Sequence, residues 1–259
     1  MTTLAEIPLR QRKQAQTRLA LLDAVLQRLD GKRTLDDIPV KELCDAANIS
    51  QASFFNYFPS KTDLLVYFVQ IWSLDLAGRV HTGAGASSSA REAIETIFVS
   101  TAREARQHPG VMAEIIAHQA RMMAPPVTAE LSLAERLLAF PGRPELIDLP
   151  AVGLDGLLPP LLARAVSDRE LPATVDQQAA FLGLTAIFFG VPLVLARRDP
   201  ALVEPLYRQQ LAIYWAGLGA THARTSSTGK PAATRKPSTT RKPSTTDEPG
   251  TTRKPRRTP

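Results

Sequence analysis

The chain has 259 residues, 44% of them apolar, which is enough for one or two domains with a buried core. A single cysteine, Cys44, excludes an internal disulfide and suits a reducing compartment. The formal charge of +6 is unevenly divided, because residues 221–259 hold ten Lys and Arg against two acids, whereas residues 1–220 hold 21 basic and 23 acidic residues. The N-terminus lacks an apolar stretch, so we expect no signal peptide.

Hydrophobic spacing predicts helices throughout the body and no sheet, so the expected fold class is all-α. We expect a basic N-terminal arm over residues 1–15 and a first helix over 16–29. Two short helices follow over 39–46 and 50–56, and Ser50 is the predicted N-cap of the second. Together these helices predict a compact helix-turn-helix domain over 16–60.

The next segment predicts a larger helical domain over 61–220. Its first helix is expected to open at Ser60, with Asp63 in the position that completes a capping box. The later helices are expected at about 90–107, 110–123, 127–140, 154–168, 174–197 and 200–218. The apolar run 179–196 only just reaches the length of a membrane span. Its Gly, Thr and Pro residues and the amphipathic helices on both sides favour a buried helix, so we expect no membrane association.

The C-terminal region, 221–259, consists of six-residue repeats of the type TRKPST. It holds no large apolar residue after Ala223, so it cannot bury enough surface to offset the entropy of ordering. A proline in every repeat also forbids a helix. We therefore expect a disordered basic tail, which either lies along DNA phosphates or only keeps the protein in solution.

The stretch LCDAANISQASFFNYF predicts two short helices joined by the tight connection Ala47-Asn48-Ile49. A helix-turn-helix needs a turn residue that tolerates a positive φ, and Asn48 meets that need. Leu43 and Ile49 are spaced to pack the two helices together. The small Cys44 is expected to be a buried apolar residue and not a redox centre.

This stretch, with the residues that follow, resembles the TetR family of one-component repressors. The residues that carry the resemblance are Leu43-Cys44, Ala47-Asn48-Ile49-Ser50, Ser53-Phe54-Phe55-Asn56-Tyr57-Phe58, Ser60-Lys61 and Leu64-Leu65. The resemblance covers about residues 16–68. This sequence departs from the family pattern where Asn48 replaces a glycine, Phe55 replaces a tyrosine that donates to a phosphate, and Tyr57 replaces a histidine. Pro59 is a tolerated variant.

A helix-turn-helix places the N-terminal part of its second helix in the major groove. The residues expected at base edges are Gln51, Ala52 and Ser53, with Asn56 at a base edge or a phosphate. The resemblance implies phosphate contacts by Tyr57 and Lys61, and DNA contacts by the basic arm through Arg10, Arg12 and Lys13. Two alternatives stay open, because the arm could be a solvated charge run and Ser53 could serve only its own helix backbone.

Phe54 and Phe58 lie four residues apart on one helix face, which predicts a role in the core. Phe55 lies beside that face, and the sequence leaves open whether it joins the core or packs on the sugar–phosphate backbone.

The resemblance also implies that the larger domain binds a small effector and dimerises through the helices at 174–197 and 200–218. The candidate pocket residues are aromatic, apolar or weakly polar: Phe68, Trp72, Phe98, Ile115, His118, Gln119, Met122 and Phe140. The alternative for each of them is a place in the core.

The four histidines show no metal-ligand spacing with Cys44, and no catalytic or cofactor motif is present, so we expect no metal, no cofactor and no enzyme activity. The leading hypothesis is a cytoplasmic, homodimeric transcriptional repressor that binds a near-palindromic DNA operator and is released by an unknown small apolar effector. A nucleoid-associated protein that coats DNA through its basic tail is the alternative. An enzyme is a third hypothesis, but the sequence supplies no acid–base pair for it.

Overall fold

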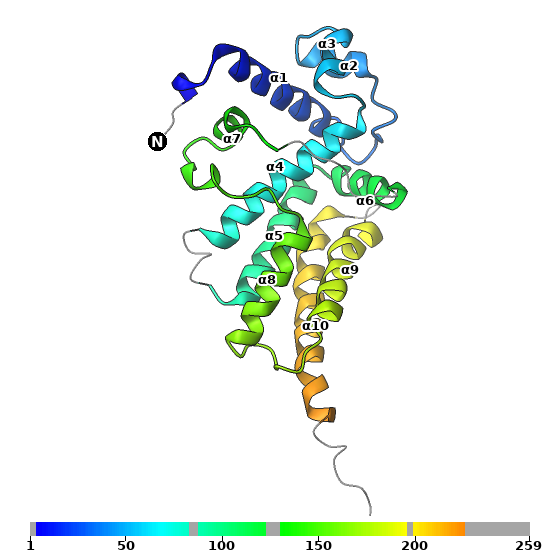
Figure 1. The fold of residues 1–259 in the computed structure, drawn as a ribbon. Helices are drawn as coiled ribbons and strands as arrows, with labels where there is room; N and C mark the ends of the chain where they lie inside the picture. Colours follow the sequence, from blue (N-terminus) through cyan, green and yellow to red (C-terminus); the bar gives the residue numbers. More distant parts are fainter. Residues whose placement is uncertain (1–3, 83–87, 123–129, 196–198, 226–259) are drawn as a thin grey trace, which may run out of the picture.

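The computed structural model describes residues 4–82, 88–122, 130–195 and 199–225, and over these residues the chain contains helices and no strand (Figure 1). The predicted all-α fold class is confirmed. The α-helices are α1 (Leu9–Leu26), α2 (Val40–Ala46), α3 (Gln51–Tyr57), α4 (Thr62–His81), α5 (Ala90–Gln107), α6 (Val111–Arg121), α7 (Leu133–Ala139), α8 (Leu154–Ser167), α9 (Gln177–Leu195) and α10 (Val203–Thr225). Short 3-10 turns lie at Leu4–Glu6, Pro144–Leu146 and Pro200–Leu202.

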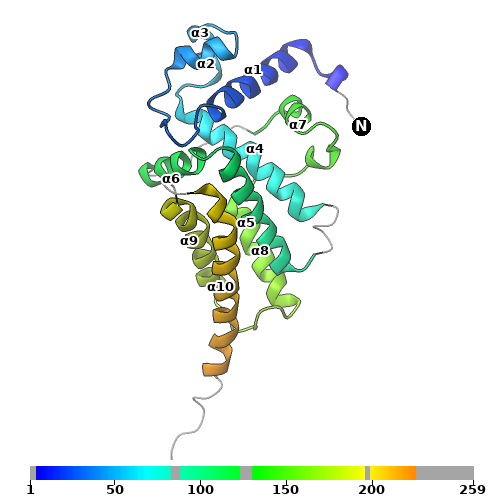
Figure 2. The same cartoon turned by 180° about the vertical axis from the view of Figure 1, so that it is seen from behind.

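Helices α1, α2 and α3 form a small head at one end of the molecule, and α4 leads from the head into a bundle (Figures 1 and 2). In the bundle, α5 packs against α4, α8 and α10, while α9 packs against α6, α8 and α10. Buried side chains from α1 to α10 form one continuous apolar core. Helix α7 lies apart from the bundle and packs along α1. The head and the bundle therefore share a core, and α7 packs on the head.

Three boundaries differ from the sequence prediction by more than five residues, and one of them is the start of α7, which lies at Leu133 and not at 127. Helix α1 begins at Leu9, so residues 10–15 form the first turns of this helix and not an extended arm. A small apolar cluster explains the earlier start, because Ala15 packs with Ile7 and with Ala134 of α7. At the other end, α10 continues to Thr225, five residues into the region expected to be a tail. The rest of that region, 226–259, lies outside the described residues.

The connection between α2 and α3 closes as predicted. Asn48 has a φ of 53°, the left-handed conformation that asparagine tolerates better than most residues. The amide of Ile49 donates to the carbonyl of Cys44 at 3.0 Å. The amide of Asn48 donates to the carbonyl of Asp45 at 3.4 Å. These two hydrogen bonds make a Schellman motif, which satisfies the last carbonyls of α2 and turns the chain into α3.

Of the two predicted helix starts, that of α3 is capped by a side chain, whereas the N-cap of α4, Lys61, makes no side-chain cap hydrogen bond. The hydroxyl of Ser50 accepts a hydrogen bond from the amide of Ser53 at 3.2 Å, which fixes the first turn of α3. The carboxylate of Asp63 accepts one from the amide of Ser60 at 2.7 Å. Regular helical structure in α4 begins two residues after Ser60, at Thr62.

The aromatic residues of α3 fill the head as predicted. Phe54 and Phe58 are buried with their ring centroids 6.1 Å apart, and the ring of Phe58 lies 5.5 Å from that of Tyr67 on α4. Cys44 is also buried, and burial raises the pKa of its thiol. These contacts fix the orientation of α3 on the head and confirm the core role of both phenylalanines.

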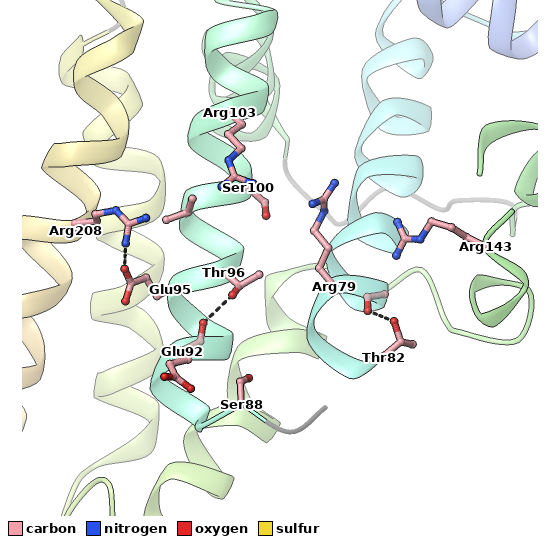
Figure 3. A pocket seen from close by; sticks show the side chains of 12 residues that line it. Arg79, Thr82, Ser88, Glu92, Glu95, Thr96, Ser100, Arg103, Arg143 and Arg208 are labelled. Carbon is pink, nitrogen blue, oxygen red and sulfur yellow. Dashed lines mark hydrogen bonds and ion pairs between the residues drawn. The ribbon is translucent and has the colours of Figure 1, made fainter. Parts of the chain in front are cut away.

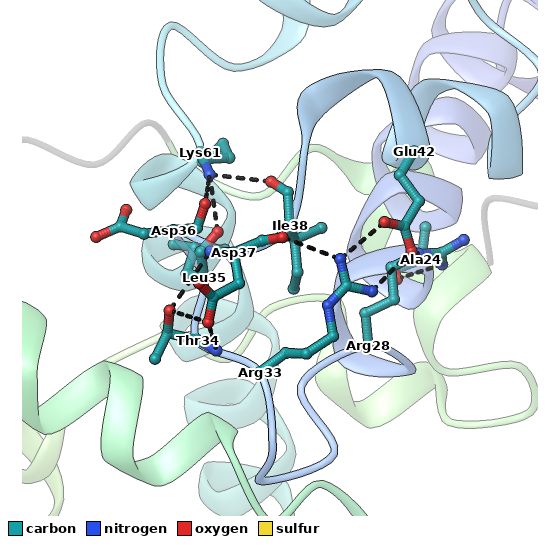
Figure 4. A network of polar contacts seen from close by, with 10 residues as sticks. All are labelled: Ala24, Arg28, Arg33, Thr34, Leu35, Asp36, Asp37, Ile38, Glu42 and Lys61. Atoms are coloured by element: carbon teal, nitrogen blue, oxygen red, sulfur yellow. Dashed lines mark hydrogen bonds and ion pairs between the residues drawn. The ribbon is translucent and has the colours of Figure 1, made fainter.

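A charged cluster ties α1 to α2 across the surface of the head (Figure 4). The carboxylate of Glu42 accepts hydrogen bonds from Arg33 at 2.8 Å and 2.9 Å and from Arg28 at 2.6 Å. These bonds, chiefly that from Arg33, lower the pKa of Glu42 from 4.5 to about 2.

Acid is therefore expected to weaken the head through Glu42. Because its pKa is lower in the folded state, the unfolded chain takes up the proton first as the pH falls. The contribution of Glu42 to the free energy of unfolding is complete above about pH 4.5 and is lost between 4.5 and about 2. Thermal unfolding followed by circular dichroism should show a smaller loss of Tm over this window for Glu42→Gln than for the unsubstituted protein. Equal losses would contradict this assignment.

Helix α9 is the one described helix that is long and apolar enough to cross a membrane by length and composition. Its contacts with α6, α8 and α10 fit a core helix, yet only 33% of its most apolar window is buried. Large apolar side chains remain exposed on this helix, and they include Leu182, Leu193 and Val194.

Candidate nucleic-acid interface

Helix α3 presents one face to the core and another to solvent. Gln51, Ala52 and Asn56 are exposed, while Ser53 and Tyr57 are half-buried. This split follows from helical spacing, since Phe54 and Phe58 occupy the opposite face. The residues predicted to meet DNA on α3 therefore lie on its accessible side.

An open groove of about 670 Å³ separates α3 from the first turns of α1. Its lining residues are Leu9, Arg10, Lys13 and Gln14 from α1 and Ser53, Asn56 and Tyr57 from α3. Five of the nine predicted DNA-contacting residues thus border one concavity. None of these lining residues is acidic, and the two cations on the α1 wall face hydroxyl and amide groups on the α3 wall. Such a groove favours a polyanion, because phosphate oxygens can pair with Arg and Lys on one wall and accept from hydroxyls and amides on the other.

Two of the residues predicted to contact DNA, Arg12 and Lys61, lie outside the groove. Arg12 is half-buried and does not line the groove. The ammonium of Lys61 donates to the backbone carbonyls of Leu35 at 2.8 Å, Asp36 at 3.2 Å and Ile38 at 2.9 Å (Figure 4). An ammonium has three N–H donors, so all of them are used. In this conformation Lys61 fastens the loop before α2 to the start of α4 and has no donor left for a phosphate.

An apolar cavity of about 230 Å³ lies inside the larger domain. It is bordered by α4, α6, α9 and the start of α8, and its walls include Val69, Trp72, Leu76, Ile115, Gln119, Leu154, Phe181, Phe188 and Phe189. Of the eight predicted pocket residues, Trp72, Ile115 and Gln119 line this cavity. The cavity is mostly apolar and partly enclosed, which suits a small apolar ligand.

The other five predicted pocket residues do not line this cavity. Phe68 is buried, and its ring stacks on Trp72 at 6.2 Å. Phe98 is buried and makes an edge contact with Phe188 at 5.4 Å. The remaining three, His118, Met122 and Phe140, are half-buried elsewhere. The three phenylalanines of α9 were not predicted as pocket residues, because that helix was expected to serve dimerisation alone, although three phenylalanines on one helix are a visible signal.

A second cleft opens on the outside of the bundle, between α4 and α5, and four arginines line it (Figure 3). Most of its charge is neutralised. Arg208 pairs with Glu95, and Arg79 and Arg143 both pair with Asp75. Among these four, Arg103 alone makes no side-chain hydrogen bond or ion pair within the described residues. This cleft is polar and open, so it does not correspond to the predicted apolar pocket.

Within the described residues, no three His, Cys, Asp or Glu side chains lie close enough to hold a metal ion.

Residues 28–68, which include α2, α3 and the start of α4, match the family described as bacterial regulatory proteins, tetR family. The matched segment includes the Schellman turn, the capped start of α3 and Lys61. The chain thus carries a helix-turn-helix of the TetR type, which supports a DNA-binding regulator.

Solved structures share the fold of this chain at low sequence identity. FadR from Bacillus subtilis, a transcriptional regulator crystallised with stearoyl-CoA, is 14% identical with a TM-score of 0.55, over 77% of this chain and 98% of that chain. FadR from Thermus thermophilus, a TetR-family repressor crystallised with lauroyl-CoA, is 18% identical with a TM-score of 0.54, over 78% and 94%. GusR from Salmonella enterica is 17% identical with a TM-score of 0.53, over 79% and 95%. No curated protein sequence matches the chain significantly.

At Phe55 this chain departs from the tyrosine expected to donate to a phosphate. Its side chain is 52% exposed, and its ring edge meets Phe54 at 5.3 Å. The exposure favours the sugar–phosphate interpretation over the core interpretation.

A hydroxyl added at this position is expected to strengthen DNA binding. Phe55→Tyr should tighten binding by about tenfold or more, the effect of one hydrogen bond to a charged group. Because phosphates carry no sequence information, the gain should be equal for specific and unrelated DNA. Fluorescence anisotropy with both DNAs measures it. A gain for one sequence only would place Phe55 at a base.

Proposed function

We propose that this DNA-binding regulator is a cytoplasmic homodimeric repressor that binds a near-palindromic operator and leaves it when a small apolar effector binds. The observation that carries the proposal is the basic groove between α1 and α3, which is open, free of lining acids and directly beside the exposed face of a helix-turn-helix. In this proposal Arg10 and Lys13 bind phosphates from the α1 wall, and Tyr57 donates to a phosphate from α3.

We assign recognition of the DNA bases to the exposed N-terminal part of α3. Gln51 can pair in bidentate fashion with an adenine, and Ala52 can contact a thymine methyl. Ser53 and Asn56 lie in the groove, where either a base edge or a phosphate is within their chemistry. The arrangement matches a recognition helix that enters the major groove with its N-terminal residues.

A dimer is supported by the apolar surface of α9 and α10. Leu193 and Val194 of α9 are 57% and 67% exposed, and Ile213 of α10 is 60% exposed. Exposed apolar residues on two long neighbouring helices fit a four-helix bundle made with the same helices of a partner copy. Two copies would then present two reading heads to one DNA duplex.

The apolar cavity is the proposed effector site. At about 230 Å³ it holds a small apolar group, such as part of an acyl chain, and the FadR structures with acyl-CoA ligands make acyl chains the first ligands to test. An effector that binds one arrangement of the head better than the other shifts the population away from the DNA-bound form.

Selection of bound sequences from a random DNA pool tests the proposal. The expected result is a two-fold-symmetric motif with half-sites about one or two helical turns apart. Recovery of sequences without such symmetry would contradict the dimeric repressor.

A shortened chain that ends at Thr225 distinguishes the repressor from the alternative, a protein that coats DNA through its basic tail. The repressor retains its motif without the tail and loses only part of its salt dependence, whereas a tail-driven DNA-coating protein loses binding even at low salt.

A further inference from the structure

Helix α7 is held to α1 by a buried ion pair. The carboxylate of Glu135 on α7 lies 2.8 Å from the guanidinium of Arg18 on α1, and the Glu135 side chain is 3% exposed. The same guanidinium stacks over the ring of Tyr67 at 4.2 Å and lies 5.1 Å from the centre of the Phe58 ring. The pair therefore sits on the aromatic core that carries α3. A buried, stacked pair of this kind resists displacement, because separating its members leaves an unpaired buried charge.

The other side of α7 is held to the loop that follows it. The guanidinium of Arg136 donates to the carbonyls of Leu146 at 2.9 Å and Ile147 at 3.1 Å, and also to that of Leu149. These bonds fasten residues 146–149 to α7 as one unit. Four residues later the same loop reaches the apolar cavity, whose wall includes Gly153 and Leu154.

The loop also contacts α4, next to the outer cleft that Gly78 and Arg143 line. Arg143 pairs with Asp75, and Leu146 packs so closely on Gly78 that a side chain at Gly78 would overlap it. A continuous chain of contacts thus runs from the cavity wall through the loop 143–153 to α7, and from α7 to α1. Helix α1 carries Arg10 and Lys13, the basic wall of the groove.

We propose that α7 is a relay that transmits occupancy of the apolar cavity to α1 and so sets the position of the basic wall against DNA. The inference rests on the proposed function, since it takes the cavity as the effector site and the groove as the DNA site. The Arg18–Glu135 ion pair connects α7 to α1, on the DNA side of the relay. The hydrogen bonds of Arg136 connect α7 to the loop, on the effector side. Both connections act through the position of α1, and their residues need not touch either ligand.

Hydrogen exchange on the full-length protein tests the relay without DNA and without a known effector. Thr185 lines the cavity, so Thr185→Phe fills part of the space that an effector would take. Exchange rates of the α1 amides over residues 9–18 are expected to change by about fivefold, a typical strength of coupling between two sites. The same filling combined with Glu135→Gln should leave α1 nearly unchanged.

Glu135→Gln is chosen because it removes the charge and keeps the cap of α7. Glu135 accepts a hydrogen bond from the amide of Ser132 at 2.8 Å, and glutamine can take that place. If the single substitution unfolds the protein, the double variant Arg18→Met/Glu135→Gln removes both charges and retains an apolar stem over the rings. The matched control is Glu95→Gln, which breaks an ion pair with Arg208 on the bundle surface and should leave the α1 response intact.

Two results would overturn the relay. One is an α1 response that persists when Glu135 is changed, since α4 alone would then carry the signal. The other is the absence of any α1 response to Thr185→Phe in the otherwise unsubstituted protein. Neither result depends on operator selection, so a failure of the relay and a failure of the proposed repressor function can be told apart.

Discussion

Phe54→Ala is expected to destabilise the protein by about 3–5 kcal/mol, the usual cost of removing a buried phenylalanine side chain. Phe54 has no exposed surface, and its ring packs between Phe55 and Phe58 at the centre of the head. The head is small, so neighbouring side chains have few ways to close the space that is left. A loss of this size is a large part of the total stability of a typical domain.

The adjacent residue provides the matched control. Phe55→Ala makes the same chemical change one position along the same helix, where the ring is 52% exposed. We expect it to cost less than about 1 kcal/mol of stability, the usual range for a surface site. Urea denaturation followed by circular dichroism measures both variants. Similar losses for Phe54 and Phe55 would contradict the division of α3 into a core face and a DNA face.

Arg10→Gln/Lys13→Gln is expected to weaken DNA binding without loss of stability. Both side chains are exposed on the α1 wall of the groove. If each neutralises one phosphate, the slope of log affinity against log salt should fall by about 2, because each phosphate contact contributes about 0.9. The loss of affinity should be equal for specific and unrelated DNA. Binding titrations at several salt concentrations measure the slope.

The control for this pair removes the same charge elsewhere. Arg91 and Arg103 are exposed on α5, outside the head. Arg91→Gln/Arg103→Gln should leave the salt slope unchanged, because only cations near the phosphates displace counterions. If both double variants reduce the slope equally, net charge and not the groove determines DNA binding.

The features of the head that arise from local chemistry were predictable from the sequence. The left-handed turn at Asn48, the cap at Ser50 and the burial of Phe54 and Phe58 each follow from a residue type and its spacing. The start of α1 was not predictable, because residues 10–14 are polar and the helix gains its packing there only through the contact of Ala15 with α7. The contact with α7 joins positions more than 100 residues apart, so no local pattern records it.

The candidate sites were predicted less well for the same reason. Helix α9 is apolar on almost every side, so its phenylalanines are visible in the sequence but their spacing does not show which face meets a cavity and which meets solvent. Phe181, Phe188 and Phe189 were therefore missed. Lys61 was expected at a phosphate because its position resembles that of the family. Its place in the structure depends on carbonyls 23–26 residues earlier in the chain, which only the folded loop brings together.

The three carbonyls around Lys61 limit which side chains can occupy that position. An ammonium can direct its donors at three converging oxygens, but the planar guanidinium of arginine cannot, so Lys61→Arg would retain the charge and still release the loop. Acetylation of the same amine would leave at least two of the carbonyls without a donor. The folded loop before α2 therefore needs a lysine at this position to satisfy its three carbonyls. The presence of this lysine in a related sequence is thus a sign of an intact head and is not, by itself, a sign of DNA contact.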